Sequence, residues 1–276
     1  MQLFHSSAYL YVSQEEITMF QIERQEQILE YINQAQKANT TELARKFNVS
    51  KVTIRRDIEA LAASGLIVKT HGGAVATNTS LIHEIPYSYK AERNQSAKKS
   101  IGIAASRYIN DGDIIILDSG STTLEIAKNI TQKNITVVTD DIKIAMELSG
   151  KSNVTVIVCG GTLSDPVYTL TGNVAVDFFS RLHVNKVFLG CDAVDLDFGI
   201  SNRTYGEVYI KTAMIEAADE IIMVTDNSKL DRKVFCHLCD ISVIDKLIIN
   251  QIDERNRRGF LEKGVEIITT EPVPEE

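Results

Sequence analysis

The sequence of 276 residues is poor in three features that mark special classes of protein: cysteine, long apolar runs and a secretory N-terminus. Its four cysteines are too few for a disulfide-stapled secreted domain and suit a reducing compartment. No stretch approaches the roughly 18 apolar residues that a membrane span needs. Residues 1–18 lack the basic segment and apolar run of a signal peptide. We therefore expect a cytoplasmic protein without membrane contact.

The N-terminal residues also lack hydrophobic periodicity, and Met19 stands directly before the first helical pattern. We expect residues 1–19 to form a mobile leader. Translation from Met1 and translation from Met19 are both compatible with this pattern.

Negative charge dominates the chain, whose formal net charge is −8, but it is distributed unevenly. Residues 20–77 carry eight Lys and Arg against six Asp and Glu, whereas the remainder carries 21 against 31. A nucleic-acid-binding protein needs a positive face where it contacts the nucleic acid, but its net charge can be negative. The charge distribution is therefore compatible with a DNA-binding domain at residues 20–77, although chance variation of the surface would also produce it.

Two helices are expected at the start of this segment. Apolar residues from Ile22 onward recur at helical spacing and predict an amphipathic first helix. Thr40 is expected to cap a second, short helix that turns Leu43 and Phe47 inward.

A third helix follows a tight turn. Ser50 is its expected N-cap, Ile54, Ile58 and Leu61 its inward face, and Gly65 its C-terminal glycine. Two short helices joined in this way predict a helix-turn-helix, whose second helix enters the major groove of DNA.

The outward face of the third helix carries the chemistry for DNA. Arg side chains can bind guanine edges, and Ser, Thr and Lys can reach bases or phosphate. Arg55 lies closer to the buried side, where Asp57 is its expected partner. Residues 66–69 are expected to form a strand and residues 70–73 its tip, which together make a wing. The residues expected to contact DNA are Thr40, Thr41, Ser50, Lys51, Thr53, Arg55, Arg56, Lys69 and His71.

A small helical domain with a solvated basic face would show the same three helices. The ordered succession of caps, turn, basic helix and wing favours DNA binding. Residues 49–58 (VSKVTIRRDI), followed by Leu61, Gly65 and residues 69–74 (KTHGGA), closely resemble the N-terminal signature of the DeoR family of bacterial transcriptional regulators. The resemblance implies that a sugar-phosphate-sensing domain follows.

Residues 78–95 show no sustained period and are expected to be a linker to a second domain at residues 96–272. Strand-like and helix-like segments alternate there, which predicts a mostly parallel sheet flanked by helices. The strands, expected to be buried on both faces, are 114–117, 135–138, 154–158, 186–189, 221–224 and 247–249. The helices are 122–130, 142–148, 174–182 and 204–218. The expected fold class is thus α/β, with a winged helix-turn-helix at the N-terminus.

Small, polar and charged residues follow four of these strands. Parallel strands end at the same edge of a sheet, so these segments should converge on one ligand site. The first segment suits a phosphate, because Gly120 permits close approach and the hydroxyl side chains can donate at a helix N-terminus. Thr122 and Glu125 could also form a capping box, which is compatible with phosphate binding. The residues expected to bind the effector are Asp118, Ser119, Gly120, Ser121, Thr122, Thr123, Gly160, Gly161, Asp192 and Lys229.

The same segments resemble the sensor domain of the DeoR family, which is similar in fold to sugar-phosphate isomerases. The resemblance adds Glu207 and Lys211 to the effector site. Cys191, Ala193 and Asp140 depart from the usual family pattern and leave the identity of the ligand open.

An isomerase, a zinc-binding protein and an architectural DNA-binding protein are the alternatives. A ribose-5-phosphate isomerase would use carboxylates placed like Asp192 and Glu207, but residues 199–206 lack the Lys- and Gly-rich run of that enzyme. Cys236 and Cys239 have no second pair to complete a zinc site. An architectural DNA-binding protein would have no use for the convergent loops.

The sequence therefore predicts a repressor of a carbohydrate-utilisation operon, without catalytic residues, cofactor or metal, whose binding to a double-stranded DNA operator is modulated by a sugar phosphate. We expect a homo-oligomer, because one helix-turn-helix reads only a few base pairs. Dimer and tetramer stay open, as do induction and co-repression.

Overall fold

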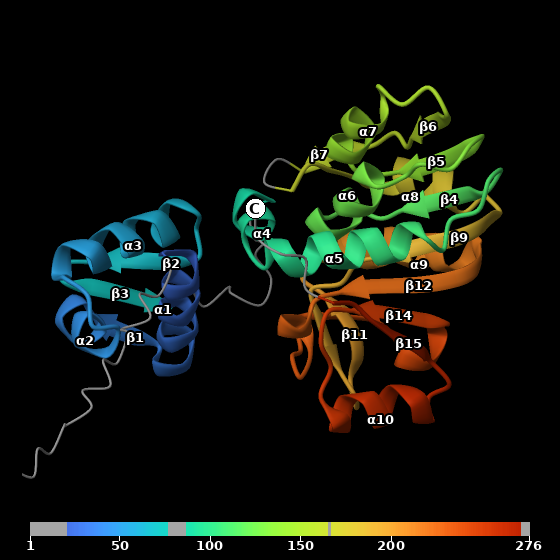
Figure 1. The fold of residues 1–276 in the computed structure, drawn as a ribbon. Coiled ribbons are helices and arrows are strands. Elements are labelled where there is room, and N and C mark those ends of the chain that lie inside the picture. The colour runs from blue at the N-terminus through green and yellow to red at the C-terminus, as the bar shows by residue number, and fades with distance from the viewer. Residues whose placement is uncertain (1–20, 77–86, 165–166, 272–276) are drawn as a thin grey trace, which may run out of the picture.

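The computed structural model of the protein describes residues 21–76, 87–164 and 167–271. The leader expected at residues 1–19 and the first half of the expected linker, residues 78–86, lie outside these residues. The described chain forms a small N-terminal domain and a larger α/β domain (Figure 1).

The N-terminal domain combines three helices with a small antiparallel sheet. Its elements are α1 (Gln21–Ala35), β1 (Lys37–Asn39), α2 (Thr40–Lys46), α3 (Lys51–Ala63), β2 (Ile67–Thr70) and β3 (Gly73–Ala76). The apolar stripes of the three helices meet in one buried cluster that contains Ile32, Leu43 and Ile58. The helix-turn-helix and wing are confirmed. The sequence did not predict β1, because a three-residue strand with one buried side chain, Ala38, gives no periodic signal.

Both ends of α3 form as the sequence predicts. The side chain of Ser50 accepts a hydrogen bond from the Thr53 N–H at 3.1 Å. Gly65 has a φ of 69°, a left-handed conformation that suits glycine, and the Leu66 N–H donates to the Leu61 carbonyl. The second helix of the helix-turn-helix is thus fixed at both ends.

The start of α2 differs from the prediction by one residue. Asn39 is the N-cap, since its side-chain oxygen accepts from the Glu42 N–H at 2.8 Å. Thr40 is buried, and its N–H and hydroxyl both donate to the Gly72 carbonyl, at 2.8 and 3.0 Å. Thr40 therefore ties α2 to the wing tip.

The expected pairing of Arg55 with Asp57 is wrong. Asp57 is fully buried and accepts hydrogen bonds from Arg24 at 2.7 Å and from Gln25 at 3.1 Å, both on α1. Arg55 is exposed. The helical turn places Asp57 beside the inward residues of α3, where it faces α1.

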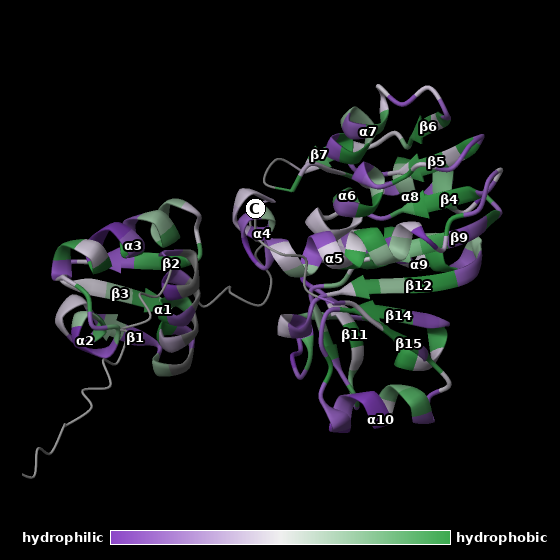
Figure 2. Ribbon diagram, in the orientation of Figure 1, coloured by the Kyte–Doolittle hydropathy of each residue, from purple (hydrophilic) through white to green (hydrophobic). Residues whose placement is uncertain are grey.

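The larger domain is built on a seven-stranded parallel sheet in the order β15-β14-β12-β9-β4-β5-β6. Its strands are β4 (Ile114–Leu117), β5 (Ile135–Thr139), β6 (Val154–Val158), β9 (Val184–Leu189), β12 (Ala218–Thr225), β14 (Lys246–Ile249) and β15 (Glu266–Thr269). These strands are largely hydrophobic, as burial on two faces requires (Figure 2). The predicted α/β fold is confirmed.

Helices cover both faces of the sheet. One buried cluster joins α5 (Gln95–Ser106), α6 (Ser121–Lys128) and α7 (Ile142–Leu148) to one face. Two further clusters join α8 (Asn173–Phe179), α9 (Tyr205–Glu216) and α10 (Glu254–Glu262) to the other. In the part of the chain that the structure describes, no helix is long and apolar enough to cross a membrane.

Shorter elements complete the domain. They are α4 (Tyr87–Glu92), the β7–β8 hairpin (Thr162–Ser164 and Thr169–Thr171), the antiparallel sheet of β10 (Ala193–Asp195), β11 (Gly199–Asn202) and β13 (Cys236–Cys239), and the short 3-10 helices η1 (Asn227–Lys229) and η2 (Ile241–Val243). α4 and the start of α5 lie within residues 78–95, so the described part of the expected linker contains regular structure.

One strand is less buried than predicted. β6 is the edge of the sheet, and Ile157 and Val158 are 40% and 38% exposed. An edge strand has a neighbour on one side only, and its apolar composition does not reveal its place in the strand order.

Candidate functional site

The recognition helix α3 presents a positive face. Ser50, Lys51, Arg55 and Arg56 are exposed near its N-terminal half, and Thr53 is half-buried. Val52 is also exposed on this half, and an apolar side chain there suits a thymine methyl group. The sequence analysis did not select Val52, because an apolar residue in a helix is normally assigned to the core.

The remaining residues expected to contact DNA divide into two groups. Thr41, Lys69 and His71 are exposed, and Lys69 forms an ion pair with Glu59 of α3 at 2.6 Å, which places the wing strand beside that helix. Thr40 is buried beneath the wing tip, as described above, so it positions the wing.

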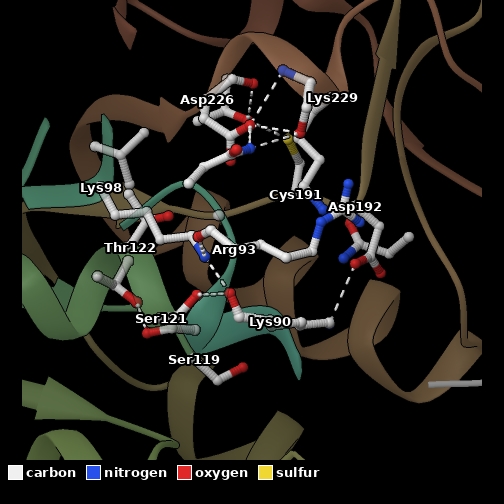
Figure 3. Close-up of a pocket in the computed structure, with 18 of the residues that line it drawn as sticks. Lys90, Arg93, Lys98, Ser119, Ser121, Thr122, Cys191, Asp192, Asp226 and Lys229 are labelled. Atoms are coloured by element: carbon white, nitrogen blue, oxygen red, sulfur yellow. Dashed lines mark hydrogen bonds and ion pairs between the residues drawn. The ribbon is translucent and has the colours of Figure 1, made fainter. Parts of the chain in front are cut away.

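The α/β domain has a pocket at the point where its strand order reverses. From β4 the chain continues outward through β5 and β6 on one side, while β9, β12, β14 and β15 follow on the other. The segments after β4, β9 and β12 therefore meet over the β4–β9 pair, the place where open α/β sheets bind ligands. The residues that line the pocket are Lys90, Arg93, Asn94, Lys98, Ser119, Gly120, Ser121, Thr122, Thr123, Gly190, Cys191, Asp192, Asn202, Glu207, Lys211, Val224, Thr225, Asp226, Ser228 and Lys229 (Figure 3).

The segment after β4 offers hydrogen-bond donors at the start of α6. Helical hydrogen bonding begins with the Leu124 N–H, which donates to the Gly120 carbonyl, so the N–H groups of residues 121–123 have no partner within the helix. Gly120 is the N-cap residue, with its N–H bound to Asp141 at 3.1 Å. The alternative capping box is wrong, because Thr122 lies inside α6 and Glu125 pairs with Lys128.

Positive charge exceeds negative charge around the pocket. Five cationic side chains line it, against three carboxylates. Burial favours the neutral form of Lys98 and lowers its pKa to about 8. Burial opposes the charged form of Asp192 as well, but Lys90, Lys229 and Arg203 outweigh it and lower the pKa of that carboxyl. An anion is the ligand that this balance of charges suits.

The floor of the pocket is a buried ion pair between Asp118 and Lys211. Burial opposes the charged form of Lys211, but the carboxylates of Asp118 and Glu207 outweigh it, so its pKa is raised. Asp118 also accepts from the Gly190 N–H at 2.7 Å and is completely buried. Asp118 does not line the pocket, and its contact with a ligand stays a prediction. Asp118 holds Lys211 and the segment after β9 in place.

Asp140 lies behind this pair and is also buried. Burial and the Asp118 carboxylate raise its pKa well above its usual range. Burial and the neighbouring carboxylate thus favour the neutral form of Asp140 beneath the pocket.

The structure brings most of the expected effector residues together but not all. Residues 119–123, Asp192, Glu207, Lys211 and Lys229 line the pocket. Gly160 and Gly161 do not, because they follow β6, two strands away from β4. A side chain at Gly161 would collide with the backbone of β8, so this glycine serves the packing of the β7–β8 hairpin.

Several pocket residues escaped the sequence analysis. Lys90 comes from α4, Lys98 from α5 and Arg93 from the turn between them, where Asn94 adopts a left-handed conformation that interrupts the helical period. Asn202 comes from β11, and Asp226 directly follows β12. The close spacing of three cations at residues 90–98 was the available signal.

Comparison with known proteins identifies both domains. Residues 24–80 match the DeoR-like helix-turn-helix domain, and residues 93–251 match the DeoR C terminal sensor domain. YulB, an uncharacterized HTH-type transcriptional regulator of Bacillus subtilis (strain 168), is 34% identical over 250 residues, which cover 90% of this chain and 96% of that one. The glycerol-3-phosphate regulon repressor of Escherichia coli (strain K12) is 30% identical over 228 residues, which cover 82% of this chain and 90% of that one.

Solved structures show a weaker likeness. Ribose 5-phosphate isomerase A from Neisseria gonorrhoeae aligns with a TM-score of 0.38 and 14% identity, over 52% of this chain and 56% of that one.

Proposed function

We propose that this chain, which belongs to the DeoR family of DNA-binding transcriptional regulators, represses a carbohydrate-utilisation operon under the control of a phosphorylated sugar. Membership of the family makes it a transcriptional regulator and not an enzyme. Repression, the operon class and the effector are the proposal. A related chain named as a glycerol-3-phosphate regulon repressor supports repression.

The observation that carries the proposal is the meeting of two kinds of group in one pocket. The start of α6 supplies N–H and hydroxyl donors, and Lys90, Arg93 and Lys229 supply positive charge, which together suit a phosphate. The carboxylates and amides of Asp192, Asn202 and Asp226 suit the hydroxyl groups of a sugar. A phosphorylated sugar has both parts.

The DNA-binding part of the proposal rests on α3 and the wing. Lys51, Arg55 and Arg56 present three positive side chains on its exposed face. We propose that this face reads the operator in the major groove and that Lys69 and His71 approach the backbone. A homo-oligomer, a dimer or tetramer, would place two such helices on a symmetric operator.

The test begins with an operator obtained by selection from random duplex DNA. Operator affinity is then measured by fluorescence anisotropy with glucose 6-phosphate, fructose 6-phosphate, ribose 5-phosphate and glycerol 3-phosphate, and with each parent compound lacking phosphate. We expect at least one phosphorylated compound to change the affinity fivefold or more, and its parent to have no effect. If every phosphorylated compound in an extended panel leaves operator affinity unchanged, the sensor function is wrong.

A further inference from the structure

Helix α4 contacts the DNA-binding domain through Tyr89 and the effector pocket through Lys90, and the pocket residue Arg93 directly follows the helix. Tyr89 is 8% exposed and belongs to the buried cluster formed by α1, α2, α3 and the wing strands. Lys90 and Arg93, the next residues on the same short segment, line the effector pocket. In Figure 1 this helix lies between the two domains. It therefore touches both domains.

Arg93 links the two roles directly. Its guanidinium carbon lies 5.6 Å from the centre of the Tyr89 ring, within the range of a cation–π contact. The same side chain lines the pocket and points toward its interior in Figure 3. A change in the position of the guanidinium thus alters its contact with an aromatic ring that is packed in the DNA-binding domain.

Lys90 ties α4 to the segments that would hold a ligand. Its ammonium forms an ion pair with the buried carboxylate of Asp192 at 3.2 Å. Its carbonyl accepts a hydrogen bond from Lys98 and another, of 3.4 Å, from the Ser121 hydroxyl at the start of α6. A ligand that engages Ser121 or neutralises Lys90 therefore acts on the backbone of α4.

We propose that Lys90 and Arg93 bind the anionic group of the effector and that α4, through Tyr89, transmits its binding to the DNA-binding domain. This inference rests on the proposed function, since it names the route by which the effector acts. A phosphate draws the Arg93 guanidinium into a charge-assisted hydrogen bond, which is stronger than its contact with the ring. The effector then favours one position of the DNA-binding domain over another, as a coupling between two sites requires.

The N-terminal end of α4 is held by contacts outside the pocket. Substitutions there can therefore change the transmission of effector binding without changing the binding itself. The Lys143 ammonium lies 4.6 Å from the Tyr87 ring centre and 4.2 Å from that of Tyr168, and the two rings pack edge to face at 5.8 Å. None of these three residues lines the effector pocket. They anchor the start of α4 to α7 and to the β7–β8 hairpin.

Effector affinity and its coupling to DNA are measured separately in the full chain. Calorimetry gives the affinity for the active sugar phosphate, and anisotropy gives operator affinity with and without it. We expect Arg93→Gln to weaken the sugar phosphate at least tenfold. We expect Tyr89→Leu and Lys143→Gln to keep effector affinity within threefold and to reduce the effector-induced change in operator affinity at least threefold. Lys128→Ala, on the exposed side of α6, is the control and should behave as the wild type.

The inference is overturned if Tyr89→Leu and Lys143→Gln both keep the wild-type coupling, or if Arg93→Gln keeps wild-type effector affinity. If Tyr89→Leu misfolds, Lys143→Gln still tests the inference, because Lys143 lies outside the buried clusters of α5–α7 and of the DNA-binding domain.

Hydrogen exchange with inorganic phosphate as the probe separates this inference from the proposed function. Protection of residues 118–124 together with a change in residues 54–67, the latter lost in Tyr89→Leu, supports the route through α4 even if no sugar phosphate alters operator binding. Protection of residues 118–124 with no change in the DNA-binding domain overturns the route and leaves the sensor intact. If neither phosphate nor any sugar phosphate protects residues 118–124, the sensor and the route both fail.

Discussion

Asp118 and Lys211 form a completely buried ion pair beneath the effector pocket, joining the end of β4 to the middle of α9. The pair is separated by more than ninety residues in sequence, and it also holds the Gly190 N–H after β9. One carboxylate thereby fixes two strand ends and one helix relative to each other.

Removing one partner of this pair should destabilise the sensor domain. Lys211→Ala leaves the Asp118 carboxylate buried without its counter-ion, and we expect the free energy of unfolding to fall by about 3–5 kcal/mol. Urea denaturation without ligand, followed by circular dichroism, measures it. The control is Lys128→Ala, which breaks an exposed pair with Glu125 and should change the free energy by about 0–1 kcal/mol. Equal effects of the two substitutions would contradict the role given to the buried pair.

The effector pocket should include Ser121 and exclude Gly160. Ser121→Ala removes one donor to the phosphate, and we expect a loss of about 1.5–3 kcal/mol, which is roughly 10- to 100-fold in affinity. Gly160→Ala places a methyl group only against the Val174 side chain, which is exposed and can move. It should leave the affinity unchanged. Calorimetry with the active sugar phosphate decides, and a loss in Gly160→Ala as large as in Ser121→Ala would place the site elsewhere.

Effector binding should weaken as the pH rises through about 8. Burial lowers the pKa of Lys98 to about 8, so this side chain loses its charge between pH 7 and pH 9, and a phosphate favours the charged form. The effector does not titrate in this range, because the second pKa of a phosphate monoester is about 6. Binding therefore raises the pKa of Lys98, and affinity present below pH 8 is lost above it.

The matched variant for this pH dependence is Lys98→Arg, which stays charged throughout. Calorimetry at pH 7, 8 and 9 should show a decline in the wild type and a flat profile in Lys98→Arg. The same decline in both proteins would assign the titration to another group.

Sequence reading by α3 should depend on Arg56. We expect Arg56→Ala to weaken binding to the operator by about 1–3 kcal/mol and to relax the preference at one base pair. Anisotropy with the operator and with single-base variants measures both effects. Arg258→Ala, on the exposed face of α10, is the control and should bind as the wild type. A loss that is uniform over all DNA sequences would make Arg56 a phosphate contact.

The predictions from sequence were correct where the residues of a single helix or strand and its immediate neighbours determine the structure. The limits of β4 and α7 were correct to the residue, because an apolar run or a helical spacing ends there against polar residues. The cap at Ser50 and the glycine at position 65 were correct for the same reason, since each acts through its neighbours in the chain.

The predictions failed where the answer depends on a distant segment. Asp57 is bound by Arg24, 33 residues before it, and the nearer Arg55 was the wrong choice. The exposure of β6 and the exclusion of Gly160 from the pocket follow from strand order, which local spacing does not encode. Lys90 of α4 was missed because six residues are too few to show a helical period.

The order of the two domains along the chain has a consequence for protein synthesis. A growing chain emerges N-terminus first, and its domains fold as they appear. The helix that faces DNA is finished at Ala63, whereas the pocket waits for Asp226 and Lys229 after β12. A chain truncated between these points would contain the helix-turn-helix without the complete effector pocket. Premature stop codons between these points are thus expected to yield chains of this kind.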